Sequence, residues 1–570
     1  MPFTPARAPA VVDKGKKSSY STASEITTAR AITAISGALS STSAVGSAKK
    51  AMQSAKGGNY ALSLTKATAL NASRAVKTIS YELTNSGGAG IQDAFITQFN
   101  SGGSTNWTAK IGGIGGGNES VQGLSADSNG NINVVGQGDS SSTLFYNTDG
   151  TLFKTLSNLG GNDVFIAQYN RLGFINWAGR VACDGQDYAG AVCTDSNGNI
   201  TLCGNYNFSA PLIAYDKNNT QFGTSLSTNG NSEVFVAQYS STGSVNWLAR
   251  VGGSADEYSC KAACVDSNGN ITVSGITTSG DLIVYNKNGT NSLGRTFSGR
   301  AWIAQYSSAG LVNWAARITG GTNVVPQAAC VDSNGNITVT GWYNQTGVLT
   351  FYDKNDVAFG TTFDANYPNH DTYIVQYSST GSVNWAARLL QEGGHSHGYG
   401  ISADSNGNIT LTGDYISGRL FIYDKNGTLA PYLIKGPGGY SAFIIQYSSA
   451  GLVNWRAQVG INYYDGGNAV SVDSAGNINV TGYCTSDPLT AYDRDDKPFI
   501  KTFGRPNTNG DTFIVQYSST GYVKWLNVIT GSASDTARAI TSDKSGNVTV
   551  GGYFTSPTLI NPPLTIYPSI

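Results

Sequence analysis

Long hydrophobic runs, charge and recognisable cofactor motifs are all scarce in this chain of 570 residues. No apolar run reaches the ~18 residues that a membrane-spanning helix needs, so no membrane span is expected. The N-terminus, MPFTPARAPAVVDKGKK, has no apolar core behind its basic residues and does not look like an ordinary secretory signal. Neither a P-loop nor a dinucleotide fingerprint is present, so we expect no cofactor.

Cysteine is also sparse, and its pattern favours a structural role. The seven cysteines are an odd number, and none lies in the C-x-x-C spacing of metal sites. Cys193, Cys264 and Cys330 share one position of a repeated unit in which the other copies have Ser or Thr. We interpret them as small core residues of a protein made in a reducing, cytosolic compartment, with a disulfide or a reactive thiol as the alternative.

Glycine and tyrosine are abundant instead, with 71 and 31 residues, which favours β-structure with many tight turns. Three motifs each recur seven times, 66 to 72 residues apart. A turn with the sequence DSNGN, or a close variant, begins at Asp127, Asp195, Asp266, Asp332, Asp404, Asp473 and Asp543. A tryptophan in the context VNWAAR, or a variant, lies at Trp107, Trp177, Trp247, Trp314, Trp385, Trp455 and Trp525. The third motif is an apolar pentamer such as FVAQY or FIVQY. So strict a period indicates stacked copies of one supersecondary unit.

Each unit has the pattern of β-strands. Within residues 400–460, NITLTGDY alternates apolar and polar residues, and the Asn-Gly pair at 406–407 is a hairpin dipeptide. The repeats contain no stretch with helical periodicity. Four or five antiparallel strands repeated seven times predict an all-β fold, a seven-bladed β-propeller over residues 79–570. The regularly spaced tryptophans are expected to fill the spaces between blades.

The motif order CVDSNGNITVTG, DTFIVQYSSTG and VNWLARVGG resembles the bacterial seven-bladed β-propeller (SBBP-type) repeat family and, more distantly, NHL-type blades. The resemblance implies the fold but no catalytic residues. The sequence departs from that family by about 25–30 extra residues between the second and third strands. This insertion carries a recurrent tyrosine at Tyr146, Tyr215, Tyr285, Tyr352, Tyr423, Tyr492 and Tyr567. It is either a fifth strand or a separate layer.

The phase of the repeats predicts how the ring closes. The repeat region begins with a third and a fourth strand and ends with a first and a second strand. One blade is therefore expected to be composite, which pairs the two edges that an open ring would expose. The variable loops and the insertions are expected on one face, opposite the DSNGN turns, and binding usually occurs on such loops.

Candidate ligand-contacting residues lie in these loops. The candidates are Tyr463, Tyr464, Tyr399, Tyr367, His395, His397, Asp187 and Asp256. The tyrosines are typical of carbohydrate sites, whereas blade packing is the alternative. His395 and His397, with His370, form either a metal site or ordinary loop histidines, and we expect no metal. Asp187, Asp256, Asp465 and Asp535 either line a polar site or cap loops.

Two further motifs have a functional and a structural interpretation. GHSHG at 394–398 formally matches the nucleophile elbow of hydrolases, but no helix follows it, so we expect no catalytic residue there. DSNGN and DKNGT resemble fragments of calcium loops, yet no closing Glu follows, and a turn that hydrogen-bonds its own backbone explains them.

Residues 1–78 form a basic arm rich in Ala, Ser, Thr and Lys, expected to be extended with a short helix capped by Ser24. Residues 1–80 carry 11 basic and two acidic side chains, whereas the rest of the chain has an excess of acids. We interpret the arm as an anchor to an acidic or structured partner, with a solvated tail as the alternative and nucleic acid disfavoured. The anchor candidates are Lys14, Lys16, Lys17, Arg30, Lys49 and Lys50.

These features favour a non-enzymatic structural or binding protein, displayed on a larger assembly through residues 1–78. Tandem Asn-rich repeats, reduced cysteines and no signal peptide resemble capsid-associated or surface proteins of large DNA viruses. The expected place is thus a virion or particle surface, with the cell surface or the extracellular space as the alternative. Other structural proteins are the expected partners. A lectin-like glycan-binding propeller and a propeller hydrolase are the alternative functions.

Overall fold

The computed structural model describes residues 82–561 except 88–89, 208–209, 228–231, 279, 292–295, 297, 345–346, 364–369, 461–462 and 503–509. The chain divides into two compact units, residues 1–77 and 78–570, and the described residues belong to the second. All their regular structure is β-strand, and no helix among them is long and apolar enough to cross a bilayer. The basic arm with its anchor candidates, Tyr367 and Tyr567 lie outside the described residues.

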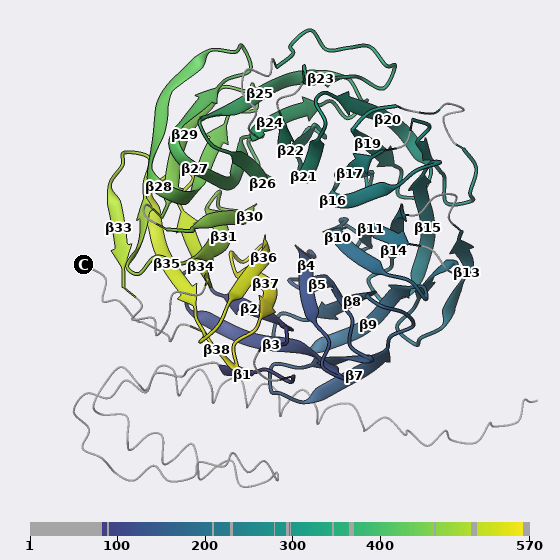
Figure 1. Cartoon of the computed structure of the whole chain (residues 1–570). Coiled ribbons are helices and arrows are strands. Elements are labelled where there is room, and N and C mark those ends of the chain that lie inside the picture. Colours follow the sequence, from purple (N-terminus) through teal and green to yellow (C-terminus); the bar gives the residue numbers. More distant parts are fainter. Residues whose placement is uncertain are drawn as a thin grey trace, which may run out of the picture. The chain divides into compact units, whose positions relative to one another are not determined.

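Seven blades of antiparallel strands form a ring (Figure 1), which confirms the predicted propeller. The innermost strands line a central channel. The first strands, at the channel, are β4 (Glu119–Ala126), β10 (Asp187–Thr194), β16 (Glu257–Val265), β21 (Val324–Val331), β26 (Ser396–Ala403), β30 (Gly466–Val472) and β36 (Asp535–Ser542). The second strands are β5 (Ile132–Gly138), β11 (Ile200–Asn207), β17 (Ile271–Thr277), β22 (Ile337–Asn344), β27 (Ile409–Tyr423), β31 (Ile478–Cys484) and β37 (Val548–Phe554).

The third and fourth strands of each blade hold the apolar-pentamer and tryptophan motifs. The third strands are β8 (Asp163–Tyr169), β14 (Ser232–Tyr239), β19 (Ala301–Tyr306), β24 (His370–Tyr377), β28 (Leu429–Tyr447), β34 (Asp511–Tyr517) and β2 (Asp93–Phe99). The fourth strands are β9 (Ile175–Ala182), β15 (Val245–Gly252), β20 (Val312–Thr319), β25 (Val383–Glu392), β29 (Val453–Val459), β35 (Val523–Ile529) and β3 (Thr105–Ile114).

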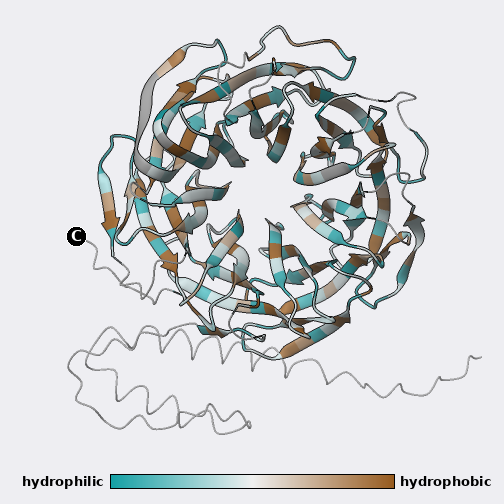
Figure 2. Cartoon of the chain, in the orientation of Figure 1, coloured by the Kyte–Doolittle hydropathy of each residue, from teal (hydrophilic) through white to brown (hydrophobic). Residues whose placement is uncertain are grey.

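The third strands are buried on both faces because each blade is packed between two others. Every residue of β8, β14 and β34 is buried, which explains why the pentamers are nearly continuous apolar runs. Figure 2 shows hydrophobic residues concentrated within the blades and hydrophilic residues in the connecting loops. All seven cysteines are buried and none forms a disulfide within the described residues, which confirms that Cys193, Cys264 and Cys330 are core residues.

Tryptophans join neighbouring blades, as predicted. The Trp247 ring of β15 stacks on Tyr306 of the next blade with centroids 6.0 Å apart, and Trp247 Nε1 donates to the Ser308 carbonyl at 3.1 Å. The same ring pair recurs as Trp107–Tyr169, Trp177–Tyr239, Trp314–Tyr377, Trp385–Tyr447 and Trp455–Tyr517. Trp525 against Phe99 completes the circle.

The insertions lie on the outer rim, which corrects the expectation that they sit on the loop face. Strands β6 (Ser142–Tyr146) and β7 (Leu152–Ser157) leave the blade of β5 and extend the preceding blade, where β6 pairs with β3. The insertion is therefore a fifth strand, followed in places by a sixth. It pairs the fourth-strand edge that would otherwise present free backbone groups. The equivalent strands are β12 (Leu212–Tyr215), β13 (Gln221–Leu226), β18 (Ile283–Val284), β23 (Thr350–Phe351), β32 (Leu489–Tyr492) and β33 (Pro498–Lys501).

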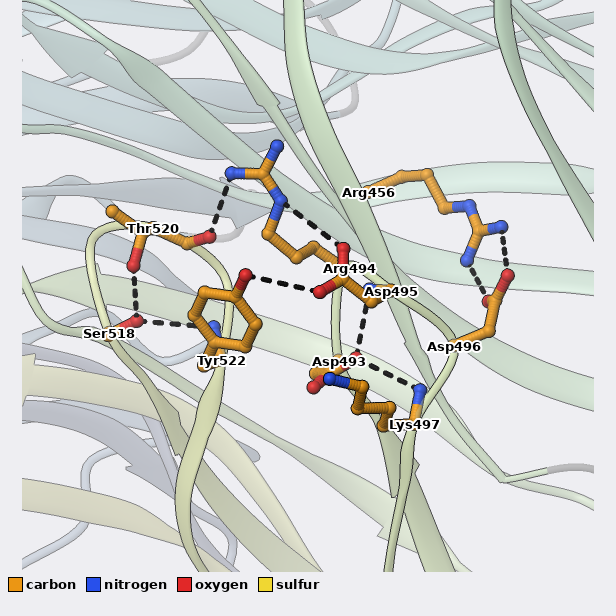
Figure 3. Close-up of polar contacts among 9 residues, drawn as sticks. All are labelled: Arg456, Asp493, Arg494, Asp495, Asp496, Lys497, Ser518, Thr520 and Tyr522. Atoms are coloured by element: carbon orange, nitrogen blue, oxygen red, sulfur yellow. Dashed lines mark hydrogen bonds and ion pairs between the residues drawn. The ribbon is translucent and has the colours of Figure 1, made fainter.

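Each insertion also contacts its own blade again, as the β32–β33 turn shows (Figure 3). The Arg494 amide donates to the Gly521 carbonyl at 3.0 Å, and Tyr522 donates its hydroxyl to Asp495 at 3.1 Å. Arg456, from the preceding blade, forms an ion pair with Asp496. The recurrent tyrosine packs under a cation of that blade, as in Arg250 over Tyr285 at 4.2 Å. The insertions thus link adjacent blades.

The closing blade is composite, as predicted. Its order is β36-β37-β2-β3, with Asp93 opposite Phe554 and Phe99 opposite Val548. The insertion of this blade is itself divided between the two ends of the propeller unit. Its halves, β38 (Thr558–Ile560) and β1 (Glu82–Thr84), pair with each other. Strands near the two ends of the unit therefore close the ring without a covalent bond.

The DSNGN motifs form the predicted self-bonded turns. Asp266 Oδ1 accepts the backbone N–H groups of Asn268 at 2.9 Å and Asn270 at 2.8 Å, and Asp266 Oδ2 accepts the Asn270 side chain at 2.8 Å. Asp127, Asp195, Asp332, Asp404, Asp473 and Asp543 accept the same bonds. Both oxygens of each carboxylate are therefore already occupied, which supports a turn over a calcium ligand.

Candidate ligand-binding site

The three histidines come together on the face that holds the fourth-to-first loops, here called the loop face. His370 begins β24, His395 precedes β26, and His397 lies in β26. His370 Nδ1 lies 2.9 Å from His397 Nε2, and the His370 amide donates to His395 Nδ1 at 3.2 Å. The sequence placed these histidines near one blade, and the structure shows that they are in direct contact.

A hydrogen-bonded chain continues from the histidines into the next blade. His397 Nδ1 lies 3.0 Å from Asp414 Oδ1, and Tyr483 donates its hydroxyl to Asp414 Oδ2 at 3.4 Å. Asp414 therefore orients the imidazole ring of His397 and the phenol ring of Tyr483. The His397 tautomer with its proton on Nδ1 would donate to this carboxylate and leave Nε2 to accept from His370.

Aromatic rings surround this chain. Trp342 stacks on His370 with centroids 4.4 Å apart and meets His397 edge-on at 5.4 Å. Tyr399 lies 5.6 Å from His397. We call Trp342, His370, His395, His397, Tyr399, Asp414 and Tyr483 the His–Tyr cluster. Beside it, Tyr440 packs on the exposed Tyr464 at 5.5 Å, which extends the aromatic surface.

Burial shifts the pKa values of four rings of the cluster toward their neutral forms. Partial burial, assisted by His397 and His395, lowers the pKa of His370 to about 4. Burial also lowers the pKa of His395. Burial, together with the Asp414 charge, raises the pKa of Tyr399 and of Tyr483 above the usual phenol value. These two imidazoles and two phenols are therefore uncharged at neutral pH.

Neither metal chemistry nor nucleophilic catalysis is favoured by this geometry. No group of three His, Cys, Asp or Glu side chains in the described part of the chain has the arrangement of a metal site. Ser396, the central residue of GHSHG, is fully buried, and its hydroxyl accepts the Thr372 amide at 3.1 Å. A buried, engaged hydroxyl does not present the exposed nucleophile that the elbow motif requires.

Carboxylates at the start of the first strands close loops, as their structural interpretation predicts. Asp187 is fully buried and accepts the Cys183 amide at 2.7 Å, so it does not face a ligand. Asp465 accepts the Thr485 amide at 2.9 Å, and Asp535 accepts the Thr555 amide at 3.1 Å. Burial raises the pKa of Asp187 to about 7 and that of Asp535 to about 6. The carbonyl of Asp256 accepts the Thr278 amide at 3.1 Å.

Of the remaining candidates, Tyr399 lies in the cluster, Tyr464 adjoins it, and Tyr463 is exposed nearby in sequence. Sequence reasoning missed Trp342, Asp414 and Tyr483. All three follow the glycine of a second strand, a position that varies between repeats: Gln137, Asn205, Ile276, Trp342, Asp414, Tyr483 and Tyr553. A variable position in an otherwise constant strand is the signal that would have found them.

No family model matches the chain, so the SBBP-type resemblance is not confirmed. An uncharacterized WD repeat-containing protein of Acanthamoeba polyphaga mimivirus is 25% identical over 444 residues, which cover 68% of this chain and 32% of that protein. The match thus spans about a third of the length of the viral relative. It agrees with a propeller of viral type.

Solved structures are only distantly similar. Rhamnogalacturonan lyase YesW is 10% identical with a TM-score of 0.31, covering 84% of this chain and 89% of its own. A protein of unknown function from Bacteroides caccae is 10% identical with a TM-score of 0.26, covering 64% and 93%. Polysaccharide lyase Uly1 is 8% identical with a TM-score of 0.29, covering 77% and 89%. The β-propeller is shown by the strand topology itself, and the mimivirus protein is a viral homologue of this chain.

Proposed function

We propose that this protein is a non-enzymatic binding propeller, displayed on a particle of a large DNA virus and anchored there by residues 1–78. The difference between the two faces of the propeller carries the proposal. The DSNGN face repeats one turn whose carboxylates bind their own backbone. The loop face departs from the repeat and gathers the His–Tyr cluster, the kind of surface that a recognition protein presents.

The similarity to a mimivirus WD-repeat protein supports the viral part of the proposal. The basic composition of residues 1–78 supports the anchoring part, since a basic segment suits an acidic partner surface. The rigid packing of the blades suits a protein that presents its loop face to a ligand. Since the blades already hold the loops in place, binding needs little further loss of conformational entropy.

Anchoring is tested with the full-length chain and a chain that begins at Thr78. Both are added to purified particles that lack the protein, and particle-bound protein is measured after sedimentation. We expect the full-length chain to bind and the shortened chain to lose at least tenfold of that binding, with an unchanged melting temperature. Equal binding of both chains would show that residues 1–78 are no anchor, and absence of the protein from native particles would refute the viral part.

The second candidate function is glycan recognition, favoured by the aromatic rings of the His–Tyr cluster. Flat faces of Trp342 and Tyr399 can cover the C–H surface of a sugar, while the partly exposed imidazoles supply hydrogen bonds to hydroxyls. Asp414 is buried and holds His397 in place for this contact. The shifted pKa values keep His370, His395, Tyr399 and Tyr483 uncharged near pH 7, which suits a neutral ligand.

A glycan array followed by titration of the best ligand tests this function. We expect Trp342→Ala and Asp414→Asn each to weaken binding at least tenfold. Tyr522→Ala, which removes an exposed aromatic residue of the opposite face, is the matched control and should bind normally. No array signal above background for the full chain, or equal binding by all variants, would exclude glycans as ligands of this cluster.

A further inference from the structure

The central channel holds a cavity of about 620 Å³ to which all seven first strands contribute. In each first strand a β-bulge interrupts the pairing with the second strand. A bulge frees a residue from the ladder and redirects its side chain. The bulge residues that line the cavity are Gln122, Gly190, Lys261, Gln327, Tyr399, Asn468 and Arg538. We call them the channel ring.

The channel ring is rich in hydrogen-bond donors and lacks acids. Lys261 and Arg538 are cationic, Gln122, Gln327 and Asn468 carry amides, and none of the cavity-lining residues is a carboxylic acid. This polarity is opposite to that of the surrounding chain, because residues 81–570 have more acidic than basic side chains. The charge of the ring is therefore local to the channel.

The two cations lie on opposite sides of the ring. The first strands follow one another in the order β36, β4, β10 and β16, so Arg538 and Lys261 are three positions apart, the largest separation in a ring of seven. Both residues line the cavity between the strands. An anion inside the cavity can therefore lie between the two cations.

Both cations lack a counter-charge within the described residues. Arg538 donates to Gln122 Oε1 at 3.0 Å and lies over the Tyr553 ring at 5.2 Å, which holds its guanidinium at the channel wall. Neither Arg538 nor Lys261 has a described carboxylate within ion-pair distance. Burial and the charge of Arg538 lower the pKa of Lys261, so the two cations repel each other when the channel is empty of anions.

We propose that the channel binds the oxyanion of a small ligand, a carboxylate or a phosphate, between the Lys261 ammonium and the Arg538 guanidinium. An anion at that place relieves the repulsion and accepts hydrogen bonds from both cations. The cavity volume lies within the range of roughly 300–1,000 Å³ typical of small-molecule sites. The proposal goes beyond the proposed function, since it requires neither the arm nor a glycan.

Calorimetric titration of the full-length protein with inorganic phosphate, and separately with malonate, at low ionic strength tests the proposal. We expect saturable binding of at least one anion, weakened at least tenfold by Lys261→Gln and by Arg538→Gln. Lys425→Gln, a cation change in a rim turn, is the matched control and should bind like the wild type. Phosphate and malonate together distinguish a phosphate ligand from a carboxylate ligand.

Melting temperatures measured without added anion show whether each variant is still folded. Because each substitution removes one of two charges that repel each other, both variants should melt at or above the wild-type temperature. Absence of saturable binding of either anion would overturn the proposal. So would folded variants that bind as tightly as the wild type, since binding would then occur elsewhere.

Discussion

Replacing Trp247 by alanine is expected to lower the free energy of unfolding by about 3–5 kcal/mol. Trp247 is 2% exposed, stacks on Tyr306 of the next blade and donates a hydrogen bond to Ser308. The substitution removes buried surface and leaves a cavity between two blades that their strand pairing holds in place. Denaturant unfolding, followed by far-ultraviolet circular dichroism, measures this loss in the free energy of unfolding.

Two companion variants separate packing from hydrogen bonding. Trp247→Phe keeps an aromatic ring against Tyr306 but lacks the Nε1 donor, so a smaller loss of roughly 1–2 kcal/mol is expected. Leu452→Ala removes a side chain that is 43% exposed and should stay within roughly 0.5 kcal/mol of the wild type. A loss for Trp247→Ala no larger than that for Leu452→Ala would contradict a packing role between the blades.

A chain that ends at Ser534 is expected not to form the native propeller. It lacks β36, β37 and β38, so the composite blade loses its first two strands, and β2 loses its pairing with β37 from Asp93 to Phe99 and keeps only β3 as a partner. An unpaired, apolar strand edge also favours aggregation. We expect the loss of the cooperative thermal transition and of the near-ultraviolet dichroism that packed aromatic rings produce.

Adding residues 535–570 as a separate peptide should restore the transition, because the composite blade is held by hydrogen bonds and packing alone. A chain that begins at Thr78 is the control for truncation as such and should melt like the full chain, since β1 to β38 all lie within Glu82–Ile560. An unchanged melting curve for the chain ending at Ser534 would show that ring closure contributes little to stability.

The architecture could be predicted because it repeats. Each motif encodes a local rule, such as an Asp that accepts the N–H groups two and four residues ahead, and seven copies remove the ambiguity that one copy leaves. The composite blade could be predicted for the same reason. The repeats start at a third strand, DAFITQF, and end at a second strand, VTVGGYF. Only pairing of these two strands leaves no free strand edge in the ring.

The candidate sites could be predicted only in part. The spacing of His395 and His397 marked one loop, but nothing in their neighbourhood indicates that Asp414 and Tyr483 complete the chain. Lys261 and Arg538 are separated by four repeats in the sequence, and they line one cavity only because the first strands of all seven blades meet around the channel. The predicted position of the insertions was wrong because each insertion pairs with the fourth strand of the preceding blade. The local sequence does not specify a partner in another blade.

The sequence by itself thus determined the number of blades, the turn and tryptophan positions, and the phase of closure, because these follow from local hydrogen bonding and a fixed period. Tertiary structure alone decided which variable residues meet. The reason is that the His–Tyr cluster and the channel ring are each made of residues from several blades. Trp342 meets His397 of the next blade, and Arg538 meets Gln122 of the next blade. Ring curvature, and not proximity along the chain, brings those positions together.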